Sequence, residues 1–271
     1  MKSPLRKRLP RELKSEFGKY LVVFIMMAIT IGFVSGFLVA DGSMLRAYDD
    51  SFQKYNIEDG YFQTKKKLTP AQKEDIEKSD VKVYENFYIE QKLTNGSTIR
   101  FFKNRKEVDK VCLMNGKMPK KSGEIAVDRM YADNNELKVG DTVKSRKKTF
   151  RITGLVALSD YSALFQNNND TMFDAVKFGV AIVTDKDFEA LNQVKVQYNY
   201  AWIYDKKPAT EKKEKKMAED LMEDMADVVT IESFVPQYQN QSIHFTGDDM
   251  GSDRAMIVML LYIVMAILAF V

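Results

Sequence analysis

The sequence predicts an α+β extracytoplasmic domain between two transmembrane α-helices. Two apolar runs without a charged residue, 21–40 and 255–271, lie on either side of a long mixed segment. Twenty residues of helix extend about 30 Å, which matches the hydrocarbon thickness of a bilayer. Between the runs, strand-like and helix-like patterns alternate with short turns, as is typical of an α+β domain.

The charges around the first run set its direction. Residues 1–20 carry a clear excess of lysine and arginine over glutamate, whereas Asp41, Asp49 and Asp50 follow the run. The positive-inside rule therefore predicts a cytoplasmic N-terminus and places residues 41–254 outside the cell membrane. An exported segment with a single cysteine fits a bacterial cell membrane. A cleaved signal peptide is the alternative, but the apolar run is longer than a usual signal core.

Residues 1–20 are expected to form a basic elbow ahead of the span. Leu5, Leu9, Leu13 and Phe17 recur at spacings of four, which gives one apolar stripe between positive faces. Such a helix suits the inner membrane surface with its anionic lipid headgroups, and Pro10 favours a start there, so we expect a helix over residues 10–19. A disordered basic tail is the alternative.

Within the first run, Gly32 and Gly36 lie four residues apart. Small residues at this spacing form a face on which another helix packs closely, so the pair is a candidate helix contact. A glycine pair that faces lipid is the alternative.

The outer segment shows a succession of local signals. Residues 44–56 continue the first span as an amphipathic helix, because apolar residues recur there at helical spacing. The Thr69-Pro70 pair opens a helix that ends at residue 78, and Asn95-Gly96 is a hairpin turn. In chain order, the strands expected are 81–93, 97–102, 124–127, 141–145, 149–156, 178–183, 196–204 and 229–234.

Three further features complete the prediction for the outer segment. Residues 166–174 are a polar loop, and residues 185–191 and 208–227 are helices. The buried stripe expected on the last helix is Met217, Leu221, Met225 and Val228. Tyr200, Trp202 and Tyr204 alternate along a strand and share one face, which is either core or an exposed aromatic ligand platform.

Composition excludes several classes of function. The chain has 41 basic and 38 acidic residues, and its lysines are interleaved with acids, so no basic face for nucleic acid is expected. Cys112 is the only cysteine, which excludes an internal disulfide and a cysteine-rich zinc site; it is expected to be buried. With His244 as the only histidine, no catalytic, metal or cofactor site is expected. Pairs such as Asp249 and Asp253 are interpreted as surface charge.

The second apolar run, 255–271, reaches the last residue without a basic flank. We therefore expect this run to be the start of a second span in a longer membrane protein. A two-span protein is the alternative.

Residues 116–143 carry a recognisable pattern. A glycine and a proline precede Glu-Ile-x-Val, and a later Leu-Lys-Val-Gly-Asp-x-Val follows; the positions are Gly116, Pro119, Glu124, Ile125, Val127, Leu137, Lys138, Val139, Gly140, Asp141 and Val143. Together with the order of elbow, span, outer domain and return span, this segment resembles permease subunits of MacB/FtsX-type ABC transporters. In physical terms the segment is structural, since Gly140-Asp141 is a turn before a strand.

The resemblance implies an ABC transporter permease of the exporter or mechanotransmission kind. It implies a cytoplasmic ATP-binding subunit and a second permease copy or paralogue as partners, besides the lipid bilayer. The chain itself has no Gly-x-x-x-x-Gly-Lys-Ser/Thr phosphate loop, so ATP hydrolysis is expected in the separate partner. The alternative is a membrane-anchored extracellular domain that senses or binds a ligand without any ATPase.

Overall fold

The computed structural model describes residues 11, 14–145, 148–191 and 193–270. The chain divides into two compact units, Met1–Tyr48 with Gly247–Val271, and Asp49–Thr246. The second unit, called the outer domain below, lies inside the predicted range 41–254. Helices α2 (Phe17–Tyr55) and α7 (Gln241–Phe270) each run from one unit into the other.

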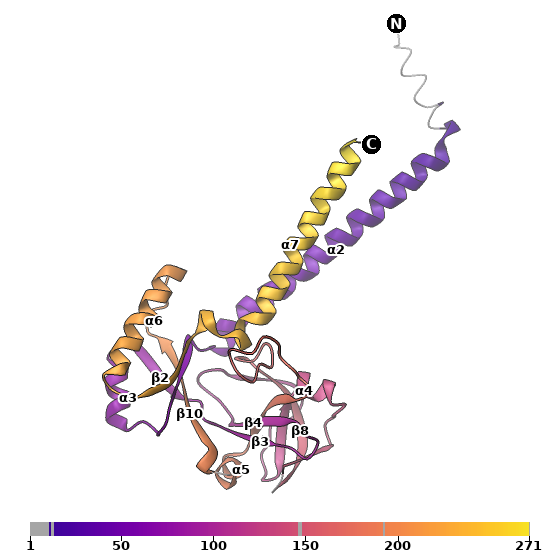
Figure 1. Cartoon of the computed structure of the whole chain (residues 1–271). Helices are drawn as coiled ribbons and strands as arrows, with labels where there is room; N and C mark the ends of the chain where they lie inside the picture. Colours follow the sequence, from indigo (N-terminus) through magenta and orange to yellow (C-terminus); the bar gives the residue numbers. More distant parts are fainter. Residues whose placement is uncertain (1–10, 12–13, 146–147, 192, 271) are drawn as a thin grey trace. The chain divides into compact units, whose positions relative to one another are not determined.

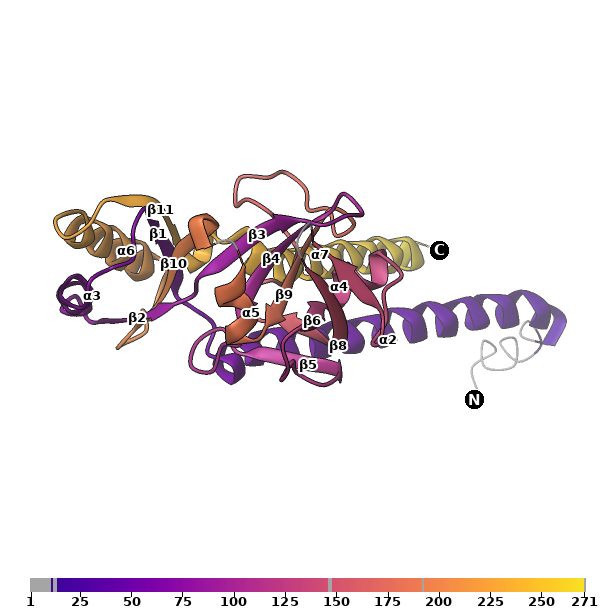
Figure 2. The same cartoon turned by 90° about the horizontal axis from the view of Figure 1, so that it is seen from below.

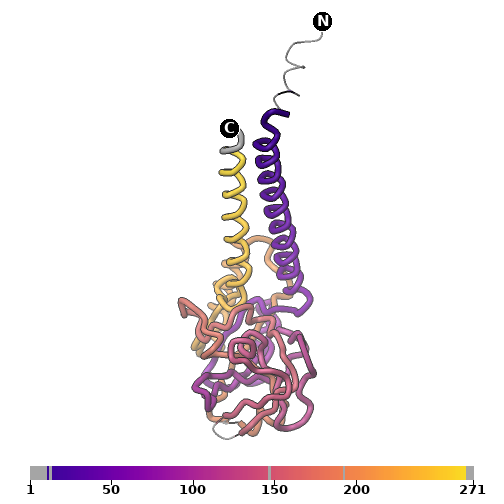
Figure 3. The backbone as a smooth tube through the Cα atoms, turned by 90° about the vertical axis from the view of Figure 1, so that its right-hand side faces the viewer, coloured from indigo at the N-terminus to yellow at the C-terminus, as the bar shows by residue number. Residues whose placement is uncertain are grey.

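In the first unit, α2 and α7 lie side by side (Figure 1, Figure 3). Arg254 Nε lies 3.9 Å from Asp41 Oδ2, and a Cβ on Gly247 would meet the ring of Tyr48 at 2.6 Å. Both helices expose large apolar side chains, among them Phe24 and Phe33 on α2 and Met256 on α7. Within the described residues, α2 is long and apolar enough to cross a membrane.

The predicted elbow lies mostly outside the described residues, which omit 1–10 and 12–13. Glu16 forms a bend, and α2 starts directly after it at Phe17. The continuation of the first span as a helix is confirmed, because α2 runs unbroken to Tyr55.

The described strands of the outer domain form one mixed sheet with the order β11-β1-β10-β3-β4-β9-β6-β8-β5, with β2 beside β10 and β7 beside β8 (Figure 2). Their bounds are β1 Gly60–Thr64, β2 Val81–Glu85, β3 Tyr88–Lys92, β4 Thr98–Lys103, β5 Val111–Gly116, β6 Glu124–Asp128, β7 Thr142–Lys144, β8 Thr149–Leu158, β9 Phe178–Val183, β10 Val196–Tyr204 and β11 Ile231–Pro236. Most neighbours are antiparallel, whereas β4 with β9 and β6 with β8 are parallel.

Two hydrophobic cores divide this sheet into lobes. The larger core, built on β3 to β9, contains Phe101 and Phe150 and is joined by α4 (Arg129–Asn134) and α5 (Asp185–Ala190). The smaller core, on β1, β2, β10 and β11, is covered by α3 (Pro70–Glu77) and α6 (Glu211–Ala226). Phe87 packs against both cores, so it marks the boundary between the lobes.

Local signals placed many elements correctly. Thr69 caps α3 with a reciprocal Gln72 contact, and the turn at Asn95-Gly96 joins β3 to β4. Strands β9 and β10 have the predicted bounds. The stripe on α6 faces the smaller core as expected, although the helix begins only after its cap Thr210.

Two predictions about strands and burial were wrong. Residues 81–93 form two strands, β2 and β3, because the chain kinks at Asn86-Phe87, where the Asn86 side chain turns to Arg105 and Asp109. Cys112 is only half-buried, because it lies on β5, a strand at the end of the sheet order that pairs with β8.

Candidate functional site

The C-terminal end of α2 is held by the loop between β4 and β5. Asn56 adopts φ 52°, the left-handed conformation that often ends a helix, and Ile57 N donates to Phe52 O at 3.0 Å. Two backbone bonds then attach the loop, from Lys110 N to Tyr55 O at 2.9 Å and from Asp109 N to Asn56 O at 3.0 Å. The helix end is therefore fixed to the domain through its own carbonyl groups.

The N-terminal end of α7 is held in a similar way by the loop that follows β8. Ser162 Oγ donates to the carbonyl oxygens of Ser242 and Ile243 at 2.9 and 2.7 Å. Ala163 N also donates to Ser242 O, at 3.1 Å, and Thr246 Oγ1 donates to Ser162 O at 2.9 Å. Each helix thus has its own holding loop within the outer domain.

A buried ion pair connects the two holding loops. Arg105, in the loop that holds α2, donates from both terminal nitrogens to Asp160, in the loop that holds α7; both distances are 2.7 Å. Each side chain is only 6% exposed. Two parallel bonds fix the mutual orientation of the groups, so the pair gives a defined geometry to the connection. Phe52 and His244, on the two helix ends, stack with ring centroids 6.2 Å apart.

Further buried polar groups surround this pair. Asn86, at the kink between β2 and β3, accepts from Arg105 at 3.2 Å and donates to Asp109 Oδ2 at 3.2 Å. Glu58 lies just after α2; its backbone N donates to Asp109 Oδ1 at 2.9 Å, and its carboxyl accepts from Asn240, just before α7, at 3.3 Å. We call Glu58, Asn86, Arg105, Asp109, Asp160 and Asn240 the junction cluster.

The electrostatics of the junction cluster favour protonated acids. Burial, followed by the charges of Asp109 and Asp160, raises the pKa of Glu58 well above its usual range. Burial and the charge of Asp160 raise the pKa of Asp109 to about 7, against a partial lowering by Arg105. Burial therefore favours the protonated forms of Glu58 and Asp109.

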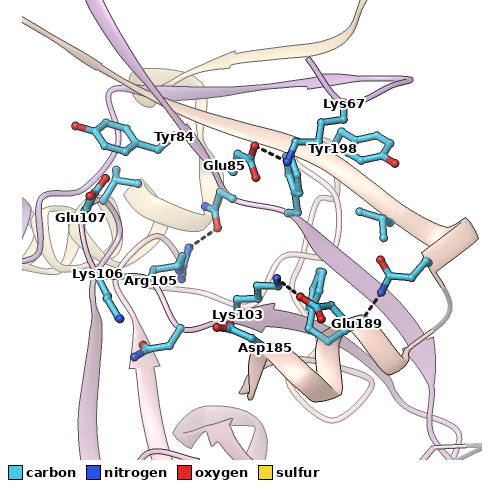
Figure 4. A pocket seen from close by; sticks show the side chains of 17 residues that line it. Lys67, Tyr84, Glu85, Lys103, Arg105, Lys106, Glu107, Asp185, Glu189 and Tyr198 are labelled. Carbon is cyan, nitrogen blue, oxygen red and sulfur yellow. Dashed lines mark hydrogen bonds and ion pairs between the residues drawn. The ribbon is translucent and has the colours of Figure 1, made fainter. Parts of the chain in front are cut away.

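A cleft of about 630 Å³ lies between the two lobes (Figure 4). Its walls come from β2, the kink, the loop after β4, α5 and the start of β10. Phe87 packs edge-on against Tyr198, with ring centroids 5.3 Å apart, and Arg105 and Asn86 belong to both the cleft and the junction cluster. Exposed ion pairs line the cleft, Lys67 with Glu85 at 2.8 Å and Lys103 with Glu189 at 3.3 Å.

The residues of the predicted signature have structural roles. Gly116 has φ +75°, and a Cβ there would meet Thr153 O at 2.4 Å. Glu124 accepts from the backbone N of Lys120 and Lys121 at 2.8 and 2.9 Å, which lowers the pKa of its carboxyl. Ile125 and Val127 are fully buried in β6, and Gly140 N and Asp141 O both bond to Ile152 at 2.8 Å. Pro119 lies in the connection before β6 and is half-buried.

The other predicted site residues lie elsewhere. Tyr200, Trp202 and Tyr204 are at most 4% exposed and belong to the smaller core, where Trp202 stacks on Phe234 at 4.7 Å, so they do not form an exposed platform. A Cβ on Gly32 or Gly36 would meet nothing within 4 Å, so the structure brings no described helix onto that face. The described residues contain no group of acids, histidine and cysteine arranged to hold a metal ion.

Comparison with known proteins gives a likeness of structure. No protein-family model matches the chain, and no curated protein matches it in sequence. The chain is similar to the extracellular domain of the noncanonic ABC-type transporter YknZ from Gram-positive bacteria, with TM-score 0.31 and 11% identity over 64% of this chain and 98% of that one. It is also similar to the periplasmic region of MacB from Actinobacillus actinomycetemcomitans, with TM-score 0.33 and 14% identity over 64% of this chain and 87% of that one.

Proposed function

We propose that this chain is a permease subunit of an ABC transporter that couples ATP hydrolysis by a cytoplasmic partner to its extracytoplasmic domain. Residues 1–20 face the cytoplasm in this arrangement, and residues 41–254 lie outside a bacterial membrane. A second permease copy or paralogue completes the transporter. The partner supplies the nucleotide chemistry, since this sequence has no phosphate loop.

One observation carries the proposal: the ends of both α2 and α7 are fixed to the outer domain, and a buried ion pair joins the two attachments. Helix α2 has 39 residues, about twice what a bilayer requires, and it continues unbroken to its attachment. A continuous helix transmits a displacement along its axis, because each turn is hydrogen-bonded to the next. The Arg105–Asp160 pair then makes the two helix ends move as one connected part of the domain.

This arrangement suits mechanotransmission, with or without export of a substrate through the bilayer. Movement of the spans reaches the junction cluster first. The cleft follows, because Asn86 and Arg105 belong to both. The geometry best supports a movement of the spans that closes or opens the cleft between the lobes.

Copurification tests the proposal directly. The native copy is tagged at its N-terminus, the membranes are solubilised gently, and the bound proteins are identified by mass spectrometry. We expect an ATP-binding subunit and a permease chain in stoichiometric amounts. Recovery of the tagged chain without any ATP-binding protein, under conditions that preserve other membrane complexes, would contradict the proposal.

The cleft favours a second candidate function, a membrane-anchored domain that senses or binds an extracellular ligand. Its volume of about 630 Å³ lies in the range of small-molecule sites, and it contains both aromatic and charged side chains. This function needs no ATPase, so the same copurification separates the two candidates.

Both candidates require the outer domain to lie outside the cell, which a labelling experiment tests. Asn169, in the polar loop after β8, is changed to cysteine on a Cys112→Ala background. A membrane-impermeant maleimide should label this variant in intact cells. Labelling only after lysis would overturn the predicted orientation.

A further inference from the structure

The junction cluster contains more buried acid than base. Glu58, Asp109 and Asp160 are 2%, 0% and 5% exposed, and one guanidinium, that of Arg105, faces them. Asp160 takes both of the short bonds from Arg105, whereas Asp109 Oδ2 lies 3.9 Å from the nearest Arg105 nitrogen. In the described chain, Glu58 Oε2 has no hydrogen-bond partner.

Such a surplus is resolved by protonation. A buried carboxylate without a counter-charge is far more costly than a buried neutral carboxyl group, so one of the acids retains a proton. Glu58 and Asp109 are the pair concerned, because the Glu58 backbone N–H already donates to Asp109 Oδ1 and the charge of Asp109 contributes to the raised pKa of Glu58. Two adjacent carboxyl groups commonly share one proton, which then belongs to the pair.

The segment before α7 brings only neutral groups to Glu58. Gln237 donates to the Glu58 carbonyl oxygen, and Asn240 donates to its carboxyl; both are neutral and precede α7. Glu58 also lines a cavity of about 40 Å³, which has room for a few water molecules. The charged and titratable groups around Glu58 are Asp59, which is paired with Lys207, and Tyr61, Tyr88, Arg100, Arg105, Asp109, Asp160 and Tyr161.

The place of this acid pair in the chain gives the proton a mechanical consequence. Glu58 follows α2 by three residues and bonds to Asn240, the residue before α7. Asp109 N donates to Asn56 O at the end of α2. A second negative charge at this point repels Asp109 from Glu58, and that repulsion acts on the attachment of both helices.

We propose that Glu58 and Asp109 form a proton-binding site, in which one shared proton fixes the ends of α2 and α7 to the outer domain and its loss to solvent loosens them. The idea that this site regulates transport in response to external pH rests on the proposed function. Proton binding itself is a property of the folded chain and requires no partner.

Infrared spectroscopy of the purified full chain in detergent detects the proton. At about pH 6, where an ordinary carboxyl group is ionised, we expect a protonated-carboxyl band that disappears at about pH 9. Glu58→Gln should remove only the share of this band that belongs to the acid pair, since Asp128 contributes a second share, and the buried Trp202 reports that the variant remains folded. Asp128→Asn is the control, because Asp128 is also buried with a pKa raised to about 7 but caps α4 in the larger lobe. A wild-type band that Glu58→Gln leaves intact would overturn the site.

Spin-label mobility then tests the mechanical consequence. Lys54, on the last turn of α2, is changed to cysteine on a Cys112→Ala background and carries a nitroxide. The nitroxide should be less mobile at about pH 6 than at about pH 9, and in Glu58→Gln its mobility should be the same at both. A pH-independent wild-type spectrum, or the same change in Glu58→Gln, would overturn the inference. Because no ATP-binding partner is present, neither result bears on the proposed function.

Discussion

The junction cluster and the cleft share Arg105 and Asn86, but the ion pair of the cluster is buried and the ion pairs of the cleft are exposed. The side chains of Arg105 and Asp160 are 6% exposed, whereas those of Lys67 and Glu85, which line the cleft, are 55% and 46% exposed. Removing one partner of a buried ion pair is costly, because the remaining charge is not solvated. An exposed ion pair contributes almost nothing to the free energy of unfolding. The domain therefore has a fixed geometry where the helices attach and an adaptable one where the lobes face each other.

Under the proposed function, this contrast gives the two regions different parts in coupling. A displacement of α2 or α7 would pass through the junction cluster with little loss, since its groups are held by directed bonds. The same displacement can alter the cleft, because its exposed pairs re-form with other partners or with water at little cost. Four changes sharpen the comparison.

Removal of the guanidinium at the junction should have the largest effect. In Arg105→Met, Asp160 stays buried without its counter-charge, and the expected loss in the free energy of unfolding is about 3–5 kcal/mol. Urea unfolding of the purified chain, followed by the fluorescence of Trp202, the only tryptophan, measures this loss. A loss as small as that of a surface change would show that the junction is not rigid.

The pH dependence of stability should reflect the same cluster. The pKa of Asp109 is about 7 in the folded state and near 4 when unfolded, so the folded chain binds more protons between these values. The contribution of Asp109 to stability is therefore fully present below about pH 4 and is lost as the pH rises to about 7, by a few kcal/mol. Asp109→Asn should flatten this part of the profile, and Asp128→Asn should remove a separate part with the same sign. An unchanged profile in Asp109→Asn would refute the assignment.

Truncation of Asn86, one of the two neutral members of the cluster, should cost less. Asn86→Ala removes one acceptor of Arg105 and one donor to Asp109, and the expected loss is about 1–3 kcal/mol. The same unfolding experiment measures it. Equal stability of Asn86→Ala and wild type would mean that the kink between β2 and β3 does not depend on this side chain.

A change on the wall of the cleft should have the smallest effect. Lys67→Met removes an exposed ion pair with Glu85, so the unfolding free energy should change by less than about 1 kcal/mol, and added salt should abolish the difference. Thermal unfolding at low and high salt measures both quantities. A loss comparable to that of Arg105→Met would erase the distinction between the two regions.

Sequence reasoning succeeded where the determining contacts are local. The cap at Thr69, the turn at Asn95-Gly96 and the buried run of β9 depend on neighbouring residues, and each was predicted. It failed at residues 81–93, because the kink at Asn86 depends on Arg105, 19 residues away. The parallel pairing of β4 with β9 has no local signal either, since its partners are 80 residues apart.

The junction cluster was missed for the same reason. In the sequence alone, Arg105 and Asp109 resemble an ordinary surface pair, and Glu58 resembles any other acid. Their burial arises only because loops that are distant in the sequence meet in space. The one sequence signal was indirect. The amphipathic continuation of the first span ends at Asn56, a residue that tolerates the left-handed conformation, so the acids just beyond it marked the point of attachment.

The most direct test of the coupling is a distance across the cleft. Lys67→Cys and Glu189→Cys, on a Cys112→Ala background, place two spin labels on exposed positions of the opposite lobes. Double electron–electron resonance of the complex with the proposed ATP-binding partner should show a distance distribution that shifts on addition of ATP. Asp160→Asn, which weakens the connection between the holding loops, should still bind the partner and lose most of the shift. An ATP-independent distance in the unaltered junction, or an equal shift in Asp160→Asn, would contradict transmission through the junction cluster.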